Sequence, residues 1–388
     1  MEFEKDLGIL TAEAGITLDA ILDFTLPKGF FLPVTPGTMH VTLGGALASN
    51  VHGKNHHHTG SIENFVMEIM VDTPKGIITC TRNADENADL FFATLGGYGL
   101  TGCILSAKIK MLRVENSSVM VKRICAKNLQ QLFELFSFHD KEYAYSVAWI
   151  DCLAKGKGLG RGVLMLGNHK GGNGQKLKVP SKILPIPFSI PFAMPSFFLN
   201  RFFISLFNAL FYWKSILSEK FSLKSPGNGK VEDYQKYFYP LDKIEKWNLL
   251  YGKRGFFQYQ CMIPDPHAEK GIAECLNFLS ENGLGAFLSV LKRCGDDTVA
   301  LPFCKRGYTL ALDIPYRGRV TEMLLDQLDE VVLRFQGKVY LTKDARLSPK
   351  TFRAMYPESK AWMQTVKKYN PEKTCNSMLA DRLELWKA

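Results

Sequence analysis

The chain has 388 residues, of which 46% are hydrophobic, and a formal net charge of +10 with a pI near 9.0. This size supports two domains with substantial cores. The charge favours an anionic partner, either a phosphate-bearing substrate or a membrane surface; no recognition motif supports nucleic acid. The nine cysteines form no C-x-x-C pair, which excludes a regular disulfide framework and predicts reduced thiols.

The first 35 residues contain alternating strand and helix patterns. Residues 9–15 alternate like a strand, Thr17 caps a short amphipathic helix, and residues 30–34 resemble a second strand. The opening segment is charged and lacks the apolar core of a signal peptide. We therefore expect a protein that is cytoplasmic or peripheral at the inner face of a membrane.

A glycine-rich stretch covers residues 36–61. It holds five glycines, Lys54 and four histidines between positions 52 and 58, and it has neither the helical nor the strand rhythm of apolar residues. Gly44 and Gly45, followed by small residues, let the backbone approach a flat group or a polyanion closely. The alternative is a glycine-rich turn in an ordinary loop.

A second glycine-dense turn follows at residues 95–102. Before it, residues 64–72 and 76–80 are predicted to form a hairpin, and residues 86–94 a helix; residues 104–111 then form a strand. Two glycine-dense segments near one ligand are what a dinucleotide needs.

The composition changes near Glu115, where we place a domain boundary. The pattern beyond it is that of an α+β substrate domain. Strands are predicted over residues 119–127, 143–151 and 162–166, with a helix over residues 129–138.

Residues 183–213 are rich in phenylalanine and contain four prolines and a single charge, Arg201. The prolines argue against a continuous transmembrane helix. We predict a short hydrophobic helix over residues 195–213 that dips into a bilayer or covers a lipid tail, because basic segments flank it. The alternative is a buried core helix.

The remaining chain alternates strands and helices. Residues 256–263 are predicted to be a strand with Gln258 and Gln260 on one face. A helix ending at Trp247 precedes it, and a final strand over residues 337–342 ends at Lys343. Between them, we predict helices over residues 266–282 and 320–336 and strands over residues 286–292 and 309–314.

Seven strings together carry a family resemblance. The segment V-T-L-G-G-A-L-A-S-N-V-H-G-K-N-H-H, residues 41–57, resembles the flavin-contacting segment of vanillyl-alcohol-oxidase-type FAD enzymes, which have a PCMH-type FAD-binding domain. The other strings follow this family in order over residues 14–37, 89–105, 145–151, 247–264, 339–346 and the tail at 351–357 and 380–385.

The resemblance implies an α+β, two-domain PCMH-type fold. Residues 1–115 would form the FAD-binding domain, residues 116–337 a substrate-binding domain on an antiparallel sheet with the 183–213 insertion, and residues 338–388 a segment returning to the FAD domain. Family members carry, ahead of the position of Glu2, a loop that wraps the FAD pyrophosphate. This chain opens in the middle of that domain, so we expect an N-terminally truncated FAD domain.

The resemblance also assigns site residues. Lys343 and His52 would lie at the reaction centre, and the FAD would be held non-covalently. The matching cofactor contacts are Gly37, Thr38, Thr42, Gly44, Gly45, Ala48, Asn50, Val51, His52, Gly53, Gly99, Gly102, Ile104 and Tyr340. The matching substrate contacts are Lys54, Gln258, Gln260, Lys292 and Thr309.

We expect no metal site. Three consecutive histidines at 56–58 cannot all face one ion in regular structure, and no carboxylate or thiolate has a suitable spacing nearby. Without the family resemblance, Lys343 would be interpreted as a solvent-exposed lysine at a strand end.

The resemblance implies an FAD-dependent oxidoreductase acting on CH–OH groups. Within the family, the chain is most similar to oxidases of polyprenyl-phosphoryl ribose, which implies oxidation of a 2′-hydroxyl to a ketone on a lipid-linked or phosphorylated sugar. A partner reductase would complete an epimerisation. Ala311 stands where the family has an active-site cysteine, so the substrate could be altered. The alternatives are an oxidase of a soluble polyol or aldonolactone, and a non-catalytic membrane-associated remnant without FAD.

Overall fold

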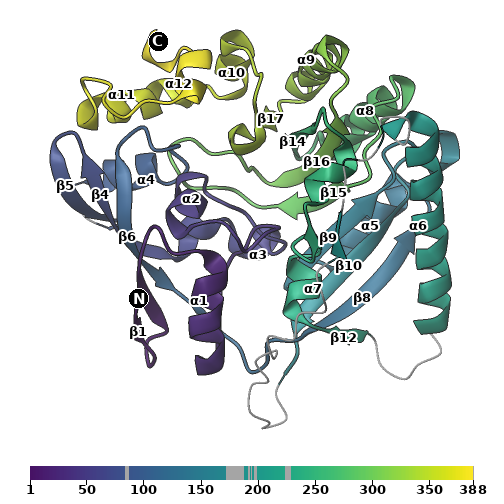
Figure 1. The fold of residues 1–388 in the computed structure, drawn as a ribbon, viewed down its shortest axis with the longest axis horizontal. Coiled ribbons are helices and arrows are strands. Elements are labelled where there is room, and N and C mark those ends of the chain that lie inside the picture. The colour runs from purple at the N-terminus through teal and green to yellow at the C-terminus, as the bar shows by residue number, and fades with distance from the viewer. Residues whose placement is uncertain are drawn as a thin grey trace.

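The computed structural model describes residues 1–83, 87–171, 188–190, 193, 195, 199–222 and 229–387. Two antiparallel β-sheets lie side by side, and the C-terminal helices pass over both of them (Figure 1). The fold is therefore α+β, as the sequence predicts. Of the hydrophobic segment, residues 183–187, 191–192, 194 and 196–198 lie outside the described residues.

The first sheet is built from the first 110 residues. Its strand order is β1-β2-β6-β4-β5, and every pair is antiparallel. The strands are β1 (Glu2–Glu4), β2 (Ile9–Glu13), β4 (Val66–Thr73), β5 (Gly76–Thr81) and β6 (Cys103–Lys110). Helices α1 (Leu18–Thr25), α2 (Leu43–Ala48) and α4 (Ala88–Thr94) bury their apolar residues in the same core as this sheet.

Two predictions for this region are wrong. The strand expected over residues 30–34 is only β3 (Phe30–Phe31), paired with β7 (Leu112–Arg113); Pro33, two residues further, has no N–H for a ladder. The glycine-rich stretch contains two short helices, α2 and α3 (His56–Thr59). The Thr42 hydroxyl begins α2 by accepting from the Gly45 amide (3.2 Å).

The second sheet has eight antiparallel strands within the described residues. Their order is β12-β8-β10-β9-β15-β16-β14-β17. The strands are β8 (Val119–Ala126), β9 (Tyr145–Ile150), β10 (Gly162–His169), β12 (Lys230–Glu232), β14 (Phe256–Pro264), β15 (Ser289–Cys294), β16 (Gly307–Pro315) and β17 (Lys338–Val339). Helices α5 (Leu129–His139), α8 (Ala268–Glu281) and α9 (Arg319–Arg334) share its main core.

This sheet consists of two similar halves. Each half is a strand, a helix and two further strands: β8-α5-β9-β10 and β14-α8-β15-β16. In both halves the third strand lies between the other two, and the halves join where β9 pairs with β15. The strands β14, β15 and β16 all belong to the second half.

Three further predictions need correction. The helix expected to end at Trp247 is instead α7 (Tyr234–Phe238), the short strand β13 (Ile244–Glu245) and a 3-10 turn (Trp247–Tyr251), with Lys246 at a left-handed φ of 54° between the last two. The helix of the hydrophobic segment is α6 (Arg201–Ser222), which begins beyond Pro195. The final strand ends at Val339, and a 3-10 turn (Leu341–Lys343) then carries Lys343.

The C-terminal segment connects the two sheets. Its strand β17 extends the second sheet, whereas α10 (Pro349–Met355), α11 (Ser359–Tyr369) and α12 (Met378–Arg382) follow as helices. The Trp362 indole N–H donates to the Ala93 carbonyl in α4 (3.1 Å), and the Asn370 amide donates to the Leu100 carbonyl in the second glycine turn (2.9 Å). Lys343 is thereby positioned between elements of both sheets.

Candidate active site

The strand β14 supplies one wall of the candidate active site. Successive side chains of a strand point to opposite faces, so Gln258 and Gln260 share the face opposite Tyr259 and Cys261. Gln260 is 2% exposed. The Gln258 amide donates to Asp313 Oδ1 (3.2 Å) on the neighbouring strand β16, directly across from it.

His52 joins the glycine-rich stretch to this wall. The Gln260 side-chain amide donates to His52 Nε2 (2.8 Å), and the His52 ring lies 5.0 Å from the Tyr340 ring. The Tyr340 amide in turn donates to the Gln260 carbonyl (2.8 Å), and its hydroxyl donates to the Ser49 carbonyl (2.7 Å). Three predicted site residues, His52, Gln260 and Tyr340, are thus brought together from positions up to 288 residues apart in the sequence.

The buried surroundings lower the pKa of both His52 and Lys343. Burial, reinforced by Lys292, lowers the pKa of His52 well below its ordinary value, so its imidazole is neutral. Burial also lowers the pKa of Lys343 to about 8, with Lys292 contributing in the same direction and Asp313 opposing. The pKa of Asp313 is raised to about 6 by burial, against the effect of Lys343. The charge on Lys343 is thus coupled to those on Lys292 and Asp313.

Lys54 and Lys292 add positive charge beside the same histidine. Burial lowers the pKa of Lys292, and burial together with Lys292 lowers the pKa of Lys54 to about 7. The Lys54 ammonium donates to the Tyr237 carbonyl and lies 4.3 Å from the centre of the Tyr237 ring. The site therefore attracts an anion.

The fit to a flavin cofactor rests on two glycines and one asparagine. A Cβ added to Gly37 or to Gly99 would meet no described atom within 4 Å, and Gly99 has a φ of 78°. Open space beside bare backbone suits a flat or anionic ligand. Asn50 Nδ2 is buried without a hydrogen-bond partner among the described residues. A buried donor of this kind needs an acceptor; the Glu63 carboxyl beside Asn50 is one, and a flavin ring edge would be another.

Other predicted glycines contact protein instead of open space. A Cβ on Gly44 would lie 2.9 Å from the Ala14 Cβ, one on Gly53 2.6 Å from Asn55 Oδ1, and one on Gly102 2.4 Å from the Asp72 carbonyl oxygen. Their small size is required by packing against neighbouring side-chain and backbone atoms of the first 110 residues. A Cβ on Gly45 would lie 3.1 Å from the Thr42 hydroxyl.

The remaining predicted cofactor contacts have local roles. Thr42 caps α2, the Thr38 hydroxyl accepts from the His40 amide (3.3 Å), and the Ala48 carbonyl accepts from the Tyr98 amide (3.0 Å). Val51 donates from its amide to the Ala46 carbonyl (3.0 Å), and Ile104 is buried in β6.

Thr309, the last predicted substrate residue, is fully buried. Its neighbour across β15 is Lys292, and its hydroxyl lies 3.9 Å from Cys294 Sγ. The structure thus places Thr309 beside Lys292 on the same face of the sheet as Gln260, but fully buried.

Asp313 is a site residue that the sequence-based prediction missed. A signal for it exists, because Asp313 is the one charged residue in the otherwise apolar string L-A-L-D-I-P. A carboxylate in a buried strand needs a partner. Its hydrogen-bonding partners are Gln258 and Tyr251, and the pairing of β14 with β16 is what brings Gln258 to it.

Comparison with known proteins supports a flavoenzyme. The family model described as "FAD binding domain" matches residues 1–81. The chain is 33% identical over 390 residues to decaprenylphosphoryl-beta-D-ribose oxidase of Mycolicibacterium smegmatis, covering 97% of this chain and 81% of that protein. It is 28% identical over 382 residues to an uncharacterized Streptomyces coelicolor protein, covering 95% and 100%.

A more distant similarity covers only part of the chain. Cytokinin dehydrogenase 3 of Arabidopsis thaliana is 39% identical over 117 residues, which is 28% of this chain and 22% of that protein. In the part of the chain that the structure describes, the helices are too short or too polar to cross a membrane.

Proposed function

Because the chain belongs to the PCMH-type FAD-dependent oxidoreductases, we propose that it oxidises a sugar hydroxyl to a ketone. The substrate we propose is a polyprenyl-phosphoryl ribose or a close analogue, oxidised at its 2′-hydroxyl. The observation that supports the proposal most strongly is the contact of His52 with Gln260 in a chain similar along 97% of its length to an oxidase of such a substrate.

FAD would be held non-covalently at the open backbone of Gly37 and Gly99, with Asn50 Nδ2 donating to it. When bound, FAD supplies the acceptor for the hydride that leaves the substrate carbon. The side chains must therefore bind the sugar, orient its hydroxyl and remove the hydroxyl proton.

His52 and Lys343 would share the work on the hydroxyl. His52 is neutral, so its Nε2, the atom that Gln260 contacts, can accept the hydroxyl proton when the substrate hydroxyl replaces the amide. Lys343, with a pKa of about 8, is mostly an ammonium at neutral pH and can stabilise the negative charge that develops on the substrate oxygen. The hydride and the proton together account for the two electrons and two hydrogens that the alcohol loses when it becomes a ketone.

The phosphate and the lipid tail have separate candidate contacts. Lys54 and Lys292 supply positive charge for the phosphate. The helix α6 carries a stripe of exposed apolar side chains for the tail: Phe202, Leu206, Leu210, Trp213 and Leu217. Their spacing of three and four residues places them on one helix face.

The opposite face of α6 is anchored to the second sheet. The Asn208 amide donates to Asp151 Oδ1 (3.0 Å), and the Tyr212 hydroxyl donates to the Ala126 carbonyl (3.0 Å). Because this face is already buried, the exposed stripe is free to contact a polyprenyl chain or the surface of the membrane that contains it.

The test combines a spectrum with turnover. The purified chain, supplied with FAD, is expected to retain flavin absorption after gel filtration and to reduce the flavin on addition of polyprenyl-phosphoryl ribose. Phosphoribose without a lipid, a soluble polyol and an aldonolactone are the matched comparison substrates. Preference for a polyol or aldonolactone would overturn the substrate assignment. A protein that stays colourless would indicate the non-catalytic remnant.

The ketone product also predicts a partner. A keto sugar on a lipid carrier requires a reductase to complete an epimerisation, so a nicotinamide-dependent reductase added to the assay is expected to consume the product.

A further inference from the structure

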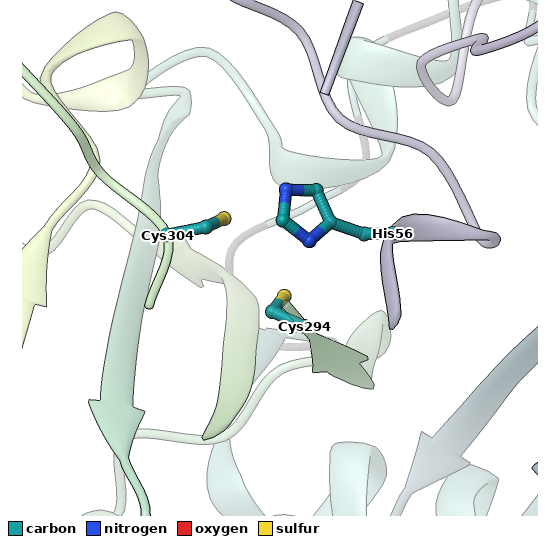
Figure 2. A group of neighbouring side chains, drawn as sticks. All are labelled: His56, Cys294 and Cys304. Carbon is teal, nitrogen blue, oxygen red and sulfur yellow. The ribbon is translucent and has the colours of Figure 1, made fainter. Parts of the chain in front are cut away.

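Two cysteines and a histidine from separate segments meet in the interior beside the candidate active site. His56 begins α3, Cys294 ends β15, and Cys304 lies between β15 and β16. One imidazole nitrogen and the two Sγ atoms all lie within 4.8 Å of one another, and the three residues are buried. Figure 2 shows the His56 ring beside both sulfur atoms.

The hydrogen bonds of His56 indicate which ring nitrogen carries the hydrogen and which has the lone pair. The Ser61 hydroxyl donates to Asp297 Oδ1 (2.7 Å), and His56 Nε2 lies 3.0 Å from the same oxygen. A carboxylate only accepts, so Nε2 carries the hydrogen. Nδ1 then has the lone pair and accepts from the Gly295 amide (2.9 Å). A histidine whose N–H is held by a carboxylate is the usual arrangement of a metal ligand.

We propose that Cys294 Sγ, Cys304 Sγ and His56 Nδ1 bind a thiophilic divalent cation of the Zn²⁺ class. Tetrahedral zinc has bonds of about 2.3 Å to sulfur and about 2.0 Å to nitrogen, which places its ligand atoms about 3.6–3.8 Å apart. The three donors therefore need to approach one another by about 1 Å at most. On binding, the cation replaces the Gly295 amide as the partner of the lone pair on His56 Nδ1.

The charge of the site favours such a cation over the empty cluster. Binding releases one proton from each thiol, and the two thiolates neutralise the dication. Because the imidazole stays neutral, the cation and its three ligands together carry no net charge in the interior, where an unpaired charge is costly. This reverses the sequence-based expectation of no metal site, since the two thiols lie 238 and 248 residues from His56.

The location indicates which segments the cation would link. The His56 and His52 ring centres are 6.1 Å apart. The cation joins α3 to β15 and to the segment that carries Cys304. It therefore holds the histidine-bearing stretch against the second sheet, next to the reaction centre and not in contact with the substrate.

A second buried pair of cysteines provides a matched control. Cys261 and Cys275 are both fully buried and hydrogen-bond to each other, and among the described residues no third metal-ligating group accompanies them. The variants Cys294→Ser, Cys304→Ser and Cys275→Ser therefore change the same residue type at the same burial.

The experiment measures zinc by elemental analysis after purification under reducing conditions, loading with Zn²⁺ and gel filtration. We expect close to one zinc per chain in the unmodified protein and in Cys275→Ser, and a loss of most of it in Cys294→Ser and Cys304→Ser. Little zinc in the unmodified protein, or equal zinc in all four proteins, would overturn the proposal.

A second measurement needs no variant, in case the serine variants fail to fold. X-ray absorption at the zinc edge of the loaded protein is expected to show two sulfur neighbours at about 2.3 Å and a nitrogen neighbour at about 2.0 Å. A spectrum with only oxygen and nitrogen neighbours would exclude the site. A Cys294–Cys304 disulfide that forms equally fast on peroxide treatment with and without zinc would also exclude the site.

Discussion

The two faces of β14 have opposite chemistry. On one face, Gln258 and Gln260 bond to Asp313 and to His52. On the other, Tyr259, Cys261 and Ile263 belong to the main core with α8 and α9. One strand thus serves function on one side and stability on the other. If this division holds, substitutions on the polar face should change catalysis and substitutions on the core face should change the free energy of unfolding.

The largest effect is expected at Lys343. Replacing Lys343 with alanine removes the positive charge beside the reacting oxygen, and turnover should fall by about 10²- to 10⁴-fold while bound flavin is kept. Lys350→Ala, on the exposed side of α10, is the control and should behave as the unmodified protein. Steady-state kinetics and the flavin spectrum measure both. Unchanged turnover in Lys343→Ala would show that the reaction centre lies elsewhere.

The core face is tested by Ile263→Ala. Ile263 is fully buried, so the substitution should lower the free energy of unfolding by about 2–5 kcal/mol, with turnover per folded molecule nearly unchanged. Gln260→Leu is the counterpart on the polar face. It should lower turnover more than it lowers stability, because it removes the donor to His52. Denaturant titration and kinetics on both variants measure the two quantities. The reverse pattern would contradict the division.

The two faces of β14 can also be compared through the pH dependence of stability, because each face has a buried carboxyl group beside it. Burial raises the pKa of Asp313 and of Asp329 to about 6, and Asp329 lies on the core side, where it accepts from the Tyr259 hydroxyl (2.9 Å). Between the unfolded pKa near 4 and the folded value near 6, the native state binds more protons than the unfolded state. Stability therefore falls as pH rises through this window, by about 1.4 kcal/mol per unit for each group.

Asparagine at either position should flatten that dependence. We expect Asp313→Asn and Asp329→Asn each to reduce the pH slope of the unfolding free energy between pH 4 and 6, as measured by denaturant titration. Only Asp313→Asn should also alter turnover. An unchanged slope in both would show that these carboxyls titrate normally in the folded protein.

The pH profile of kcat/KM should report Lys343. Because the ammonium form is the active one, kcat/KM should fall as pH rises through about 8. Asp313 opposes the lowering of this pKa, so Asp313→Asn should move the descending limb to lower pH. A rate that rises through pH 8 would instead indicate that the neutral amine acts as the base.

The smallest effect is expected on α6. Leu210→Gln and Trp213→Ser, both on the exposed stripe, should reduce co-sedimentation with anionic liposomes several-fold and leave the melting temperature unchanged. Phe138→Ser, exposed on α5, is the control for loss of one exposed aromatic side chain. Equal liposome binding by all of these proteins would contradict the proposal that the exposed stripe of α6 contacts lipid.

Much of the secondary structure could be predicted from the sequence. The strands β2, β4, β6, β8 and β14 and the helices α5, α8 and α9 agree with prediction to within two or three residues, because their apolar period is regular over many residues. The elements that the sequence predicted wrongly are short. The short helix α2 in the glycine-rich stretch is capped by Thr42, and β17 ends after two residues. The proposed boundaries near residues 115 and 337 stay predictions.

The sequence by itself determined the class of fold and the FAD-binding family, because these depend on local pattern and on strings of adjacent residues. Only the tertiary structure decided which residues face each other. The His52–Gln260 contact, the Gln258–Asp313 pair and the grouping of His56 with Cys294 and Cys304 all depend on the packing of segments that are distant in the sequence. Side chains that meet across a sheet carry no fixed spacing along the chain, so no local pattern can reveal them.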